Sequence, residues 1–241
     1  MADDGWRLQP GVFDAAIIDL DGTLVNTLGD FAAALNLMLA DLRAEGFAAT
    51  DVNTAVIRTM VGKGSEHLVK STLNHALAQS IRARAAINSV AIYDLAFARY
   101  QHHYMSVSGL YSSVYAGVPE GLLALKEAGM KLACVTNKPV AFARPLLVSK
   151  GLDKFFDQVF GGDSFERKKP DPMPLLKTCE ALGTLPARTL MIGDSSNDAA
   201  AARAAGCPVV LVTYGYNHGK PVRSVKAEGF VDSIADLRRQ A

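Results

Sequence analysis

The chain contains five short apolar runs, and a polar or glycine-containing turn follows each one. The runs are Ala15–Asp19, Lys131–Thr136, Gln158–Gly161, Thr189–Asp194 and Pro208–Thr213. Runs this short and rich in Val, Ile, Leu and Ala are typical of strands buried on both faces of a parallel sheet. Helical stretches that end in glycine lie between the later runs. The alternation therefore predicts an α/β fold with a doubly wound parallel sheet.

A different pattern fills residues 28–110, which contain no strand-like run. Phe31, Leu35, Met38, Leu39 and Leu42 recur at helical spacing, and similar apolar stripes follow further along the segment. We therefore predict a helical cap domain over residues 28–110. It is inserted into an α/β core that consists of residues 1–27 and 111–241.

Composition excludes several classes of protein. Lys plus Arg number 25 and Asp plus Glu 24, so the formal charge of +1 gives no field that attracts nucleic acid or an anionic membrane. No apolar run approaches the roughly 20 residues that span a bilayer, and the first eleven residues lack the pattern of a signal peptide. The three cysteines, Cys134, Cys179 and Cys207, have wide spacings that predict free thiols. We expect a cytoplasmic protein, either a monomer or a homodimer.

Two carboxylates follow the first predicted strand, in Asp19-Leu20-Asp21-Gly22-Thr23-Leu24. In an open α/β sheet, ligands bind at the carboxyl ends of the strands, so both carboxylates can face the binding crevice. Gly22 allows a tight turn and a close approach of the backbone to a ligand. Asp and Gly are also common in solvated turns, and this motif alone leaves that alternative open.

Further polar groups follow three of the later runs. The second run ends in Thr136-Asn137, Lys169 follows the third, and the fourth ends in Gly193-Asp194-Ser195. Each could be a helix cap or a surface loop when taken alone. Together they place carboxylates, a hydroxyl and a lysine at successive strand ends, which indicates an acidic magnesium pocket beside a phosphoryl-binding site.

Four segments carry a resemblance to a known family. The stretches DLDGTLVNT, VTNKP, KKPDP and GDSSND resemble the four motifs of the haloacid dehalogenase superfamily, in the same order, and the likeness extends over residues 14 to about 215. Within the superfamily the chain is most similar to the phosphoglycolate phosphatases. One departure is Asn26-Thr27, at a position where the family often has Asp-Ser.

The resemblance implies a role for each motif residue. Asp19 is the nucleophile that forms an aspartyl-phosphate, and Asp21 is the general acid and base. Thr136 and Lys169 hold the phosphoryl oxygens. Mg²⁺ is bound by the Asp19 carboxylate, the Asp21 backbone carbonyl and Asp194. Ser195 and Asp198 support this site, while the residues that contact substrate are Gly22, Asn137, Gly62, Lys63 and Gly64.

The predicted function is hydrolysis of a small phosphorylated metabolite, 2-phosphoglycolate, to glycolate and phosphate. The alternatives are a phosphatase of another small ester and a sugar-phosphate mutase of the same superfamily. A signalling receiver does not accommodate the helical insertion. A phosphonate hydrolase would be expected to carry a Schiff-base lysine in the cap, where the candidates are Lys63 and Lys70.

Overall fold

The computed structural model of the chain describes residues 8–9, 11–77 and 90–237. Residues 1–7, on which the expectation about a signal peptide partly rests, lie outside this range. The chain divides into two compact units. Unit 1 combines Met1–Asn26 with Ser113–Ala241, and unit 2 is Thr27–Ser112.

Unit 1 is built on a six-stranded sheet in which every adjacent pair of strands is parallel, in the order β5-β4-β1-β6-β7-β8. The strands are β1 (Ala15–Ile18), β4 (Lys131–Val135), β5 (Gln158–Phe160), β6 (Thr189–Gly193), β7 (Val209–Val212) and β8 (Gly229–Val231). The chain runs from β1 outward to β5, and then returns to β6 on the other side of β1. The sheet order therefore reverses around β1, and ligand sites in such folds lie at this point.

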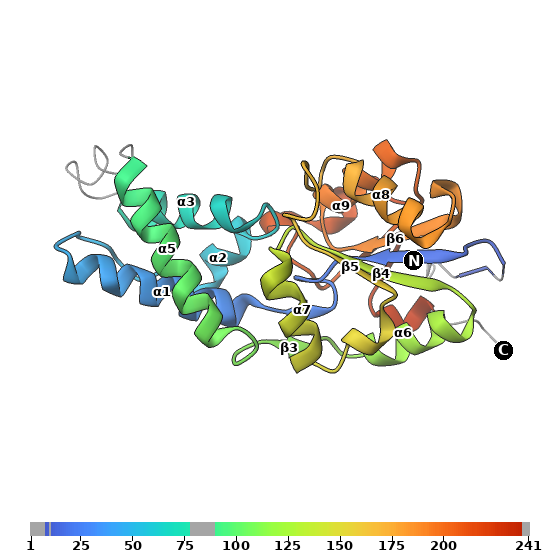
Figure 1. Cartoon of the computed structure of the whole chain (residues 1–241), viewed down its shortest axis with the longest axis horizontal. Coiled ribbons are helices and arrows are strands. Elements are labelled where there is room, and N and C mark those ends of the chain that lie inside the picture. Colours follow the sequence, from blue (N-terminus) through green and yellow to red (C-terminus); the bar gives the residue numbers. More distant parts are fainter. Residues whose placement is uncertain (1–7, 10, 78–89, 238–241) are drawn as a thin grey trace. The chain divides into compact units, whose positions relative to one another are not determined.

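Helices cover both faces of the sheet (Figure 1). They are α6 (Val118–Glu127), α7 (Val140–Ser149), α8 (Met173–Leu182) and α9 (Ser196–Ala205). Ile18 of β1 shares a buried cluster with Leu122 of α6. The adjacent Ile17 packs in a second cluster with Leu175 of α8 and Ala202 of α9. Successive strand residues point to opposite faces, so both faces of β1 are buried and the predicted doubly wound α/β fold is confirmed.

Short 3₁₀ turns complete unit 1. They are η1 (Asp153–Phe155), η2 (Pro186–Arg188), η3 (Asn217–Gly219), η4 (Val222–Ser224) and η5 (Ile234–Leu237). The three cysteines are free, as their spacing predicted, and all three are buried. Within the described residues, no helix is both long and apolar enough to cross a membrane.

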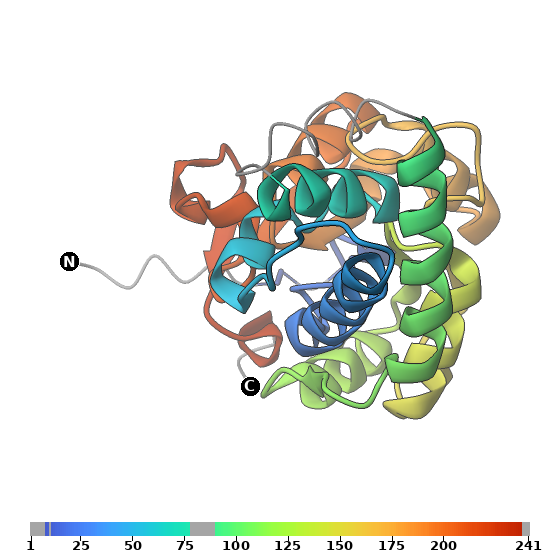
Figure 2. The ribbon, with the colours of Figure 1, turned by 90° about the vertical axis from the view of Figure 1, so that its left-hand side faces the viewer.

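Unit 2 is helical over its described residues (Figure 2). Its helices are α1 (Leu28–Ala44), α2 (Thr54–Met60), α3 (Ser65–Ala76) and α5 (Val90–Val107). The α1 helix packs on α5, where the rings of Phe31 and Tyr104 stack with centroids 5.6 Å apart. The buried Asp30 carboxylate accepts hydrogen bonds from the backbone N–H groups of Gly109 and Tyr111 at 2.8 and 2.7 Å. This side chain thus joins the first turn of the segment to its last residues.

Two features of unit 1 were not predicted. The β8 strand consists of Gly229–Val231, begins with glycine, and was not among the apolar runs recognised in the sequence. A two-stranded antiparallel ladder also pairs β2 (Val25–Asn26) with β3 (Ser113–Val114). The chain leaves unit 1 along one of these strands and re-enters along the other.

Candidate active site

The loop after β1 is folded tightly around a glycine. Asp19 follows the last residue of β1 and is 7% exposed. The backbone N–H groups of Leu24 and Val25 both donate to the Leu20 carbonyl at 3.0 Å. Gly22 has φ 87°, and a Cβ at this position would overlap the Asp194 carboxylate. Only glycine leaves room for the loop to lie against that carboxylate.

Lys169 connects three parts of the site. Its Nζ lies 2.8 Å from Asp19 Oδ1 and 2.7 Å from both Asp198 Oδ1 and the Val135 carbonyl oxygen. An ammonium group has three donors, so these three acceptors account for all of them. The side chain is 3% exposed, and a buried cation of this kind is stable only when it is paired.

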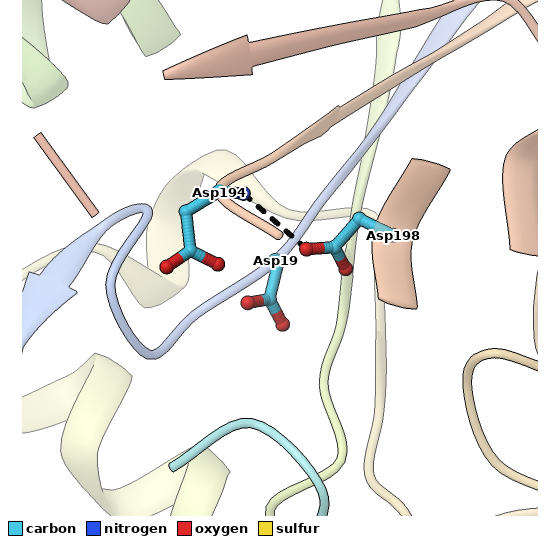
Figure 3. A group of neighbouring side chains, drawn as sticks. All are labelled: Asp19, Asp194 and Asp198. Atoms are coloured by element: carbon cyan, nitrogen blue, oxygen red, sulfur yellow. Dashed lines mark hydrogen bonds between the residues drawn. The ribbon is translucent and has the colours of Figure 1, made fainter. Parts of the chain in front are cut away.

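Three carboxylates converge at this edge of the sheet (Figure 3). Oxygens of Asp19, Asp194 and Asp198 all lie within 4.8 Å of one another. Asp194 directly follows β6, and its Oδ2 accepts a hydrogen bond from the Tyr216 backbone N–H at 2.6 Å. A Cβ on Gly215 would collide with the Asp194 side chain, so this approach also requires glycine.

Asp198 lies in the first turn of α9, where both its oxygens are engaged. Its Oδ1 accepts from Lys169, and its Oδ2 accepts from the Ser195 hydroxyl at 2.7 Å and the Ser195 backbone N–H at 3.1 Å. Carboxylates are stabilised at helix N-termini by such donors and by the helix dipole. Asp198 therefore orients Lys169 and fixes the start of α9 at the same time.

The segment after β4 lies beside the same edge of the sheet. Thr136 is 3% exposed and its backbone N–H donates to the Phe160 carbonyl at 3.1 Å. The Asn137 side-chain amide donates to the Lys169 backbone carbonyl at 2.8 Å. This hydrogen bond braces the segment that carries Lys169, and the predicted contact of Asn137 with substrate stays a prediction.

A sequence model of the haloacid dehalogenase-like hydrolases matches residues 13–206, which include Asp19, Lys169 and Asp194. The chain belongs to this family. The resemblance predicted from the four motifs is thereby confirmed, and these haloacid dehalogenase-like motifs account for the convergence at the edge of the sheet.

Curated relatives extend the match over nearly the whole chain. A phosphoglycolate phosphatase from Thiobacillus denitrificans is 44% identical over 92% of both chains. One from Nitrosospira multiformis is 42% identical over 93% of this chain and 94% of its own length. The crystal structure of a predicted phosphoglycolate phosphatase from Haemophilus somnus 129PT has a TM-score of 0.85 and 33% identity, and covers 94% of this chain and 96% of that one.

The donor set of the site fits a hard divalent cation. Carboxylate oxygens are the ligands that Mg²⁺ prefers. Four carboxylates face two ammonium groups in this region, which leaves an excess of two negative charges. These groups belong to Asp19, Asp21, Asp194, Asp198, Lys138 and Lys169.

The crowding of carboxylates shifts their proton affinities. Burial raises the pKa of the Asp19 carboxyl to about 7, and the Lys169 ammonium only partly opposes this. Burial, together with the charges of Asp198 and Asp19, raises the pKa of Asp194 well above its usual value. Burial opposes the charged form of Lys169, but the two neighbouring carboxylates outweigh it and raise the pKa of this ammonium. A cation beside Asp19 and Asp194 would relieve the repulsion between them.

The sequence interpretation missed two members of the site. Lys138 Nζ lies 2.9 Å from Asp21 Oδ1, and both side chains are largely buried. Its position between Asn137 and Pro139, in the segment that carries Thr136, was an available signal. The second is the backbone N–H of Tyr216, and no sequence pattern reveals that a main-chain group will meet Asp194.

The glycines and lysine predicted in the cap form a turn within unit 2. Gly62-Lys63-Gly64 lies between α2 and α3, and the Lys63 side chain is exposed. Gly62 has φ 103° and Gly64 has φ 90°, so the backbone requires glycine at both positions. The predicted contact between this turn and substrate stays a prediction.

Proposed function

We propose that the chain hydrolyses 2-phosphoglycolate to glycolate and inorganic phosphate. The observation that carries this is the buried Asp19 carboxylate, held 2.8 Å from Lys169 at a strand end with Asp21 two residues further along. The substrate is suggested by two relatives of 44% and 42% identity, each named a phosphoglycolate phosphatase.

In the proposed reaction, the Asp19 carboxylate attacks phosphorus and the bond to the bridging ester oxygen breaks. Asp21 gives its proton to that oxygen, so glycolate leaves as an alcohol and an aspartyl-phosphate remains on Asp19. Asp21 then takes a proton from water, which attacks phosphorus and releases inorganic phosphate. Asp19 is regenerated as a carboxylate, and Asp21 is again protonated.

Thr136 and Lys169 are proposed to bind oxygens of the transferring phosphoryl group. Phosphoryl transfer passes through a loose transition state, so the main tasks of the protein are positioning and charge neutralisation. Lys169 already donates to three protein acceptors, and any phosphoryl contact must be shared with one of them. We infer that its larger contribution is to orient and neutralise Asp19.

Mg²⁺ is the proposed cofactor, held by the Asp19 carboxylate, the Asp21 backbone carbonyl and Asp194. When bound, it supplies positive charge to the phosphoryl oxygens. Asp198 is not assigned as a ligand because Lys169 and Ser195 engage both its oxygens. Ser195 and Asp198 instead support the site from α9, as groups behind metal ligands commonly do.

The remaining predicted contacts complete the proposal. Gly22 brings the backbone of the Asp19 loop close to the substrate, and Asn137 holds the Lys169 segment. Unit 2 is proposed to act as the cap, with Gly62, Lys63 and Gly64 contributing to substrate binding. The active species is a monomer or a homodimer.

The decisive experiment is phosphate release from a panel of phosphate esters that includes 2-phosphoglycolate, larger sugar phosphates and an aryl phosphate, with Mg²⁺ and with excess chelator. The proposal predicts multiple turnovers, a preference for 2-phosphoglycolate, and no activity in chelator. Preference for a sugar phosphate would reassign the substrate. Conversion of a sugar phosphate to its isomer without net phosphate release would indicate a mutase.

A further inference from the structure

The segment after β4 contains a second buried lysine whose function is unassigned. The Lys138 side chain is 3% exposed, and its Nζ forms an ion pair with Asp21 at 2.9 Å. Asp21 is the residue proposed to protonate the leaving group. The Lys138 ammonium is therefore in direct contact with the Asp21 carboxylate, which in the proposed reaction must reach the bridging ester oxygen.

The backbone around Lys138 is held on both sides. Its N–H donates to Thr136 Oγ1 at 3.1 Å, and its carbonyl accepts from the Gly162 N–H at 2.9 Å. A Cβ on Gly162 would overlap the Asn137 carbonyl oxygen, so the two segments are in close contact. A cation on such a restrained segment is preorganised for binding, because little freedom remains to be lost.

The two buried lysines differ in what they bind. Lys169 meets the nucleophile and Asp198, with all three donors accepted by protein atoms. Lys138 meets the proposed general acid, on the leaving-group side of the reaction. A charge buried at this position is costly unless anionic groups balance it, and the substrate can bring an anionic group to the same side of the reaction.

The chemistry of the substrate supplies that partner. In 2-phosphoglycolate a single methylene carbon separates the bridging ester oxygen from the carboxylate. When the bridging oxygen lies at Asp21, the carboxylate therefore lies within reach of a cation beside Asp21. We propose that Lys138 binds the substrate carboxylate and so determines specificity for short 2-phospho acids. This inference rests on the proposed function, and assigns the carboxylate to a lysine of unit 1 rather than to Lys63.

The test uses a pair of substrates that differ only in the carboxylate. Ethyl phosphate replaces the carboxylate of 2-phosphoglycolate by a methyl group and keeps the same ester linkage. The quantity measured is the ratio of kcat/KM for 2-phosphoglycolate to that for ethyl phosphate, in the unmodified protein, Lys138→Met and Lys63→Met. Lys138→Gln provides a second neutral variant with a polar side chain, in case Lys138→Met does not fold.

Lys138→Met should lower this ratio by at least about 30-fold, the smaller end of the effect of removing one partner of a buried charge pair. Lys138→Arg should restore part of the ratio because it restores the cation. A residue that only supports Asp21 would lower activity on both alkyl esters equally. The Mg²⁺-induced rise in melting temperature should persist in each Lys138 variant and shows that the metal site is intact.

Each outcome decides between the assignments. An unchanged ratio in both neutral Lys138 variants overturns the inference while the proposed function stands, provided the unmodified protein still prefers 2-phosphoglycolate. A ratio that falls only in Lys63→Met moves the carboxylate site to unit 2. If the unmodified protein does not prefer 2-phosphoglycolate over ethyl phosphate, the proposed function fails and this inference fails with it.

Discussion

The strand ends of unit 1 and the turn of unit 2 carry similar signals in the sequence, since each combines charged residues with glycine. In unit 1, Asp19 and Lys169 are 150 positions apart and meet at 2.8 Å. In unit 2, Gly62 and Gly64 adopt positive φ angles around an exposed Lys63. The residues at the strand ends therefore meet in a cluster of side chains, whereas the residues of unit 2 form a turn between two helices.

This difference reflects the geometry of the two kinds of element. The carboxyl ends of adjacent parallel strands lie at the same edge of the sheet, so residues that follow those strands are brought together wherever they occur in the chain. No comparable geometric rule brings the turn between two helices close to polar groups elsewhere in the chain. A charged residue after a strand is therefore a stronger indication of a site than a charged residue between helices.

The largest test of the unit 1 cluster is Asp19→Asn. A neutral amide cannot attack phosphorus as a carboxylate does, so turnover should fall below detection. The fold should persist, because the amide oxygen can still accept a hydrogen bond from Lys169. Phosphate release over several turnovers measures the effect, and circular dichroism verifies the fold. Turnover close to that of the unmodified protein would remove Asp19 from the role of nucleophile.

Asp21→Asn should have a smaller effect that depends on the leaving group. Loss of general acid catalysis should lower kcat for an alkyl phosphate by about 10²–10⁴-fold. An aryl phosphate has a leaving group that needs little protonation, so its loss should be smaller. The comparison requires only kcat for the two esters in each protein. Losses of equal size would show that Asp21 supports the structure of the site without acting as an acid.

The convergence at the strand ends could be predicted from the sequence, because the carboxyl ends of adjacent parallel strands lie at the same edge of a sheet. The sequence located Asp19, Lys169 and Asp194 from their places after apolar runs, and the structure brings these residues together. It could not predict the Tyr216 contact to Asp194, since any residue has a backbone N–H. Nor could it predict that Lys138 turns toward Asp21, because the direction of a side chain in a loop depends on tertiary packing.

The apolar patterns of unit 2 also predicted the buried apolar residues but missed a buried polar contact. The α1 stripe of Phe31, Leu35, Met38, Leu39 and Leu42 is buried, as its helical spacing predicted. Burial of Asp30 in the same helix was not predicted, because its partners are the backbone groups of Gly109 and Tyr111. Periodicity identifies a buried face, whereas a buried polar contact between distant segments leaves no periodic trace.

The metal site can be tested through the pH dependence of thermal stability, for which we expect changes in melting temperature of a few degrees. The pKa of Asp19 is raised to about 7, so the folded protein holds a proton that the unfolded chain releases at lower pH. Stability from this group is therefore present at low pH and lost as the pH rises through about 7. Asp194 shifts in the same direction. Without metal, the melting temperature should be lower at pH 8 than at pH 6.

Mg²⁺ binds the ionised carboxylates, so it should raise the melting temperature more at pH 8 than at pH 6. Thermal unfolding with and without Mg²⁺ at the two pH values measures this difference. Asp19→Asn should remove much of it, whereas Lys63→Met, in the other unit, should leave it intact. Equal Mg²⁺ effects at both pH values in the unmodified protein would argue that the cation binds elsewhere.

The smallest expected effect concerns the turn of unit 2. If Lys138 binds the substrate carboxylate, Lys63→Met should change the ratio of kcat/KM for 2-phosphoglycolate to that for ethyl phosphate by only a few fold. An exposed lysine contributes weak, screened attraction, about 0–1 kcal/mol for a typical exposed pair, so any loss should shrink further as salt is added. A change above about 30-fold that persists in high salt would require a desolvated contact between Lys63 and the carboxylate. That result would assign recognition of the substrate carboxylate to the turn between α2 and α3 rather than to Lys138. It would also show that a charged residue between two helices can indicate a binding site in the sequence.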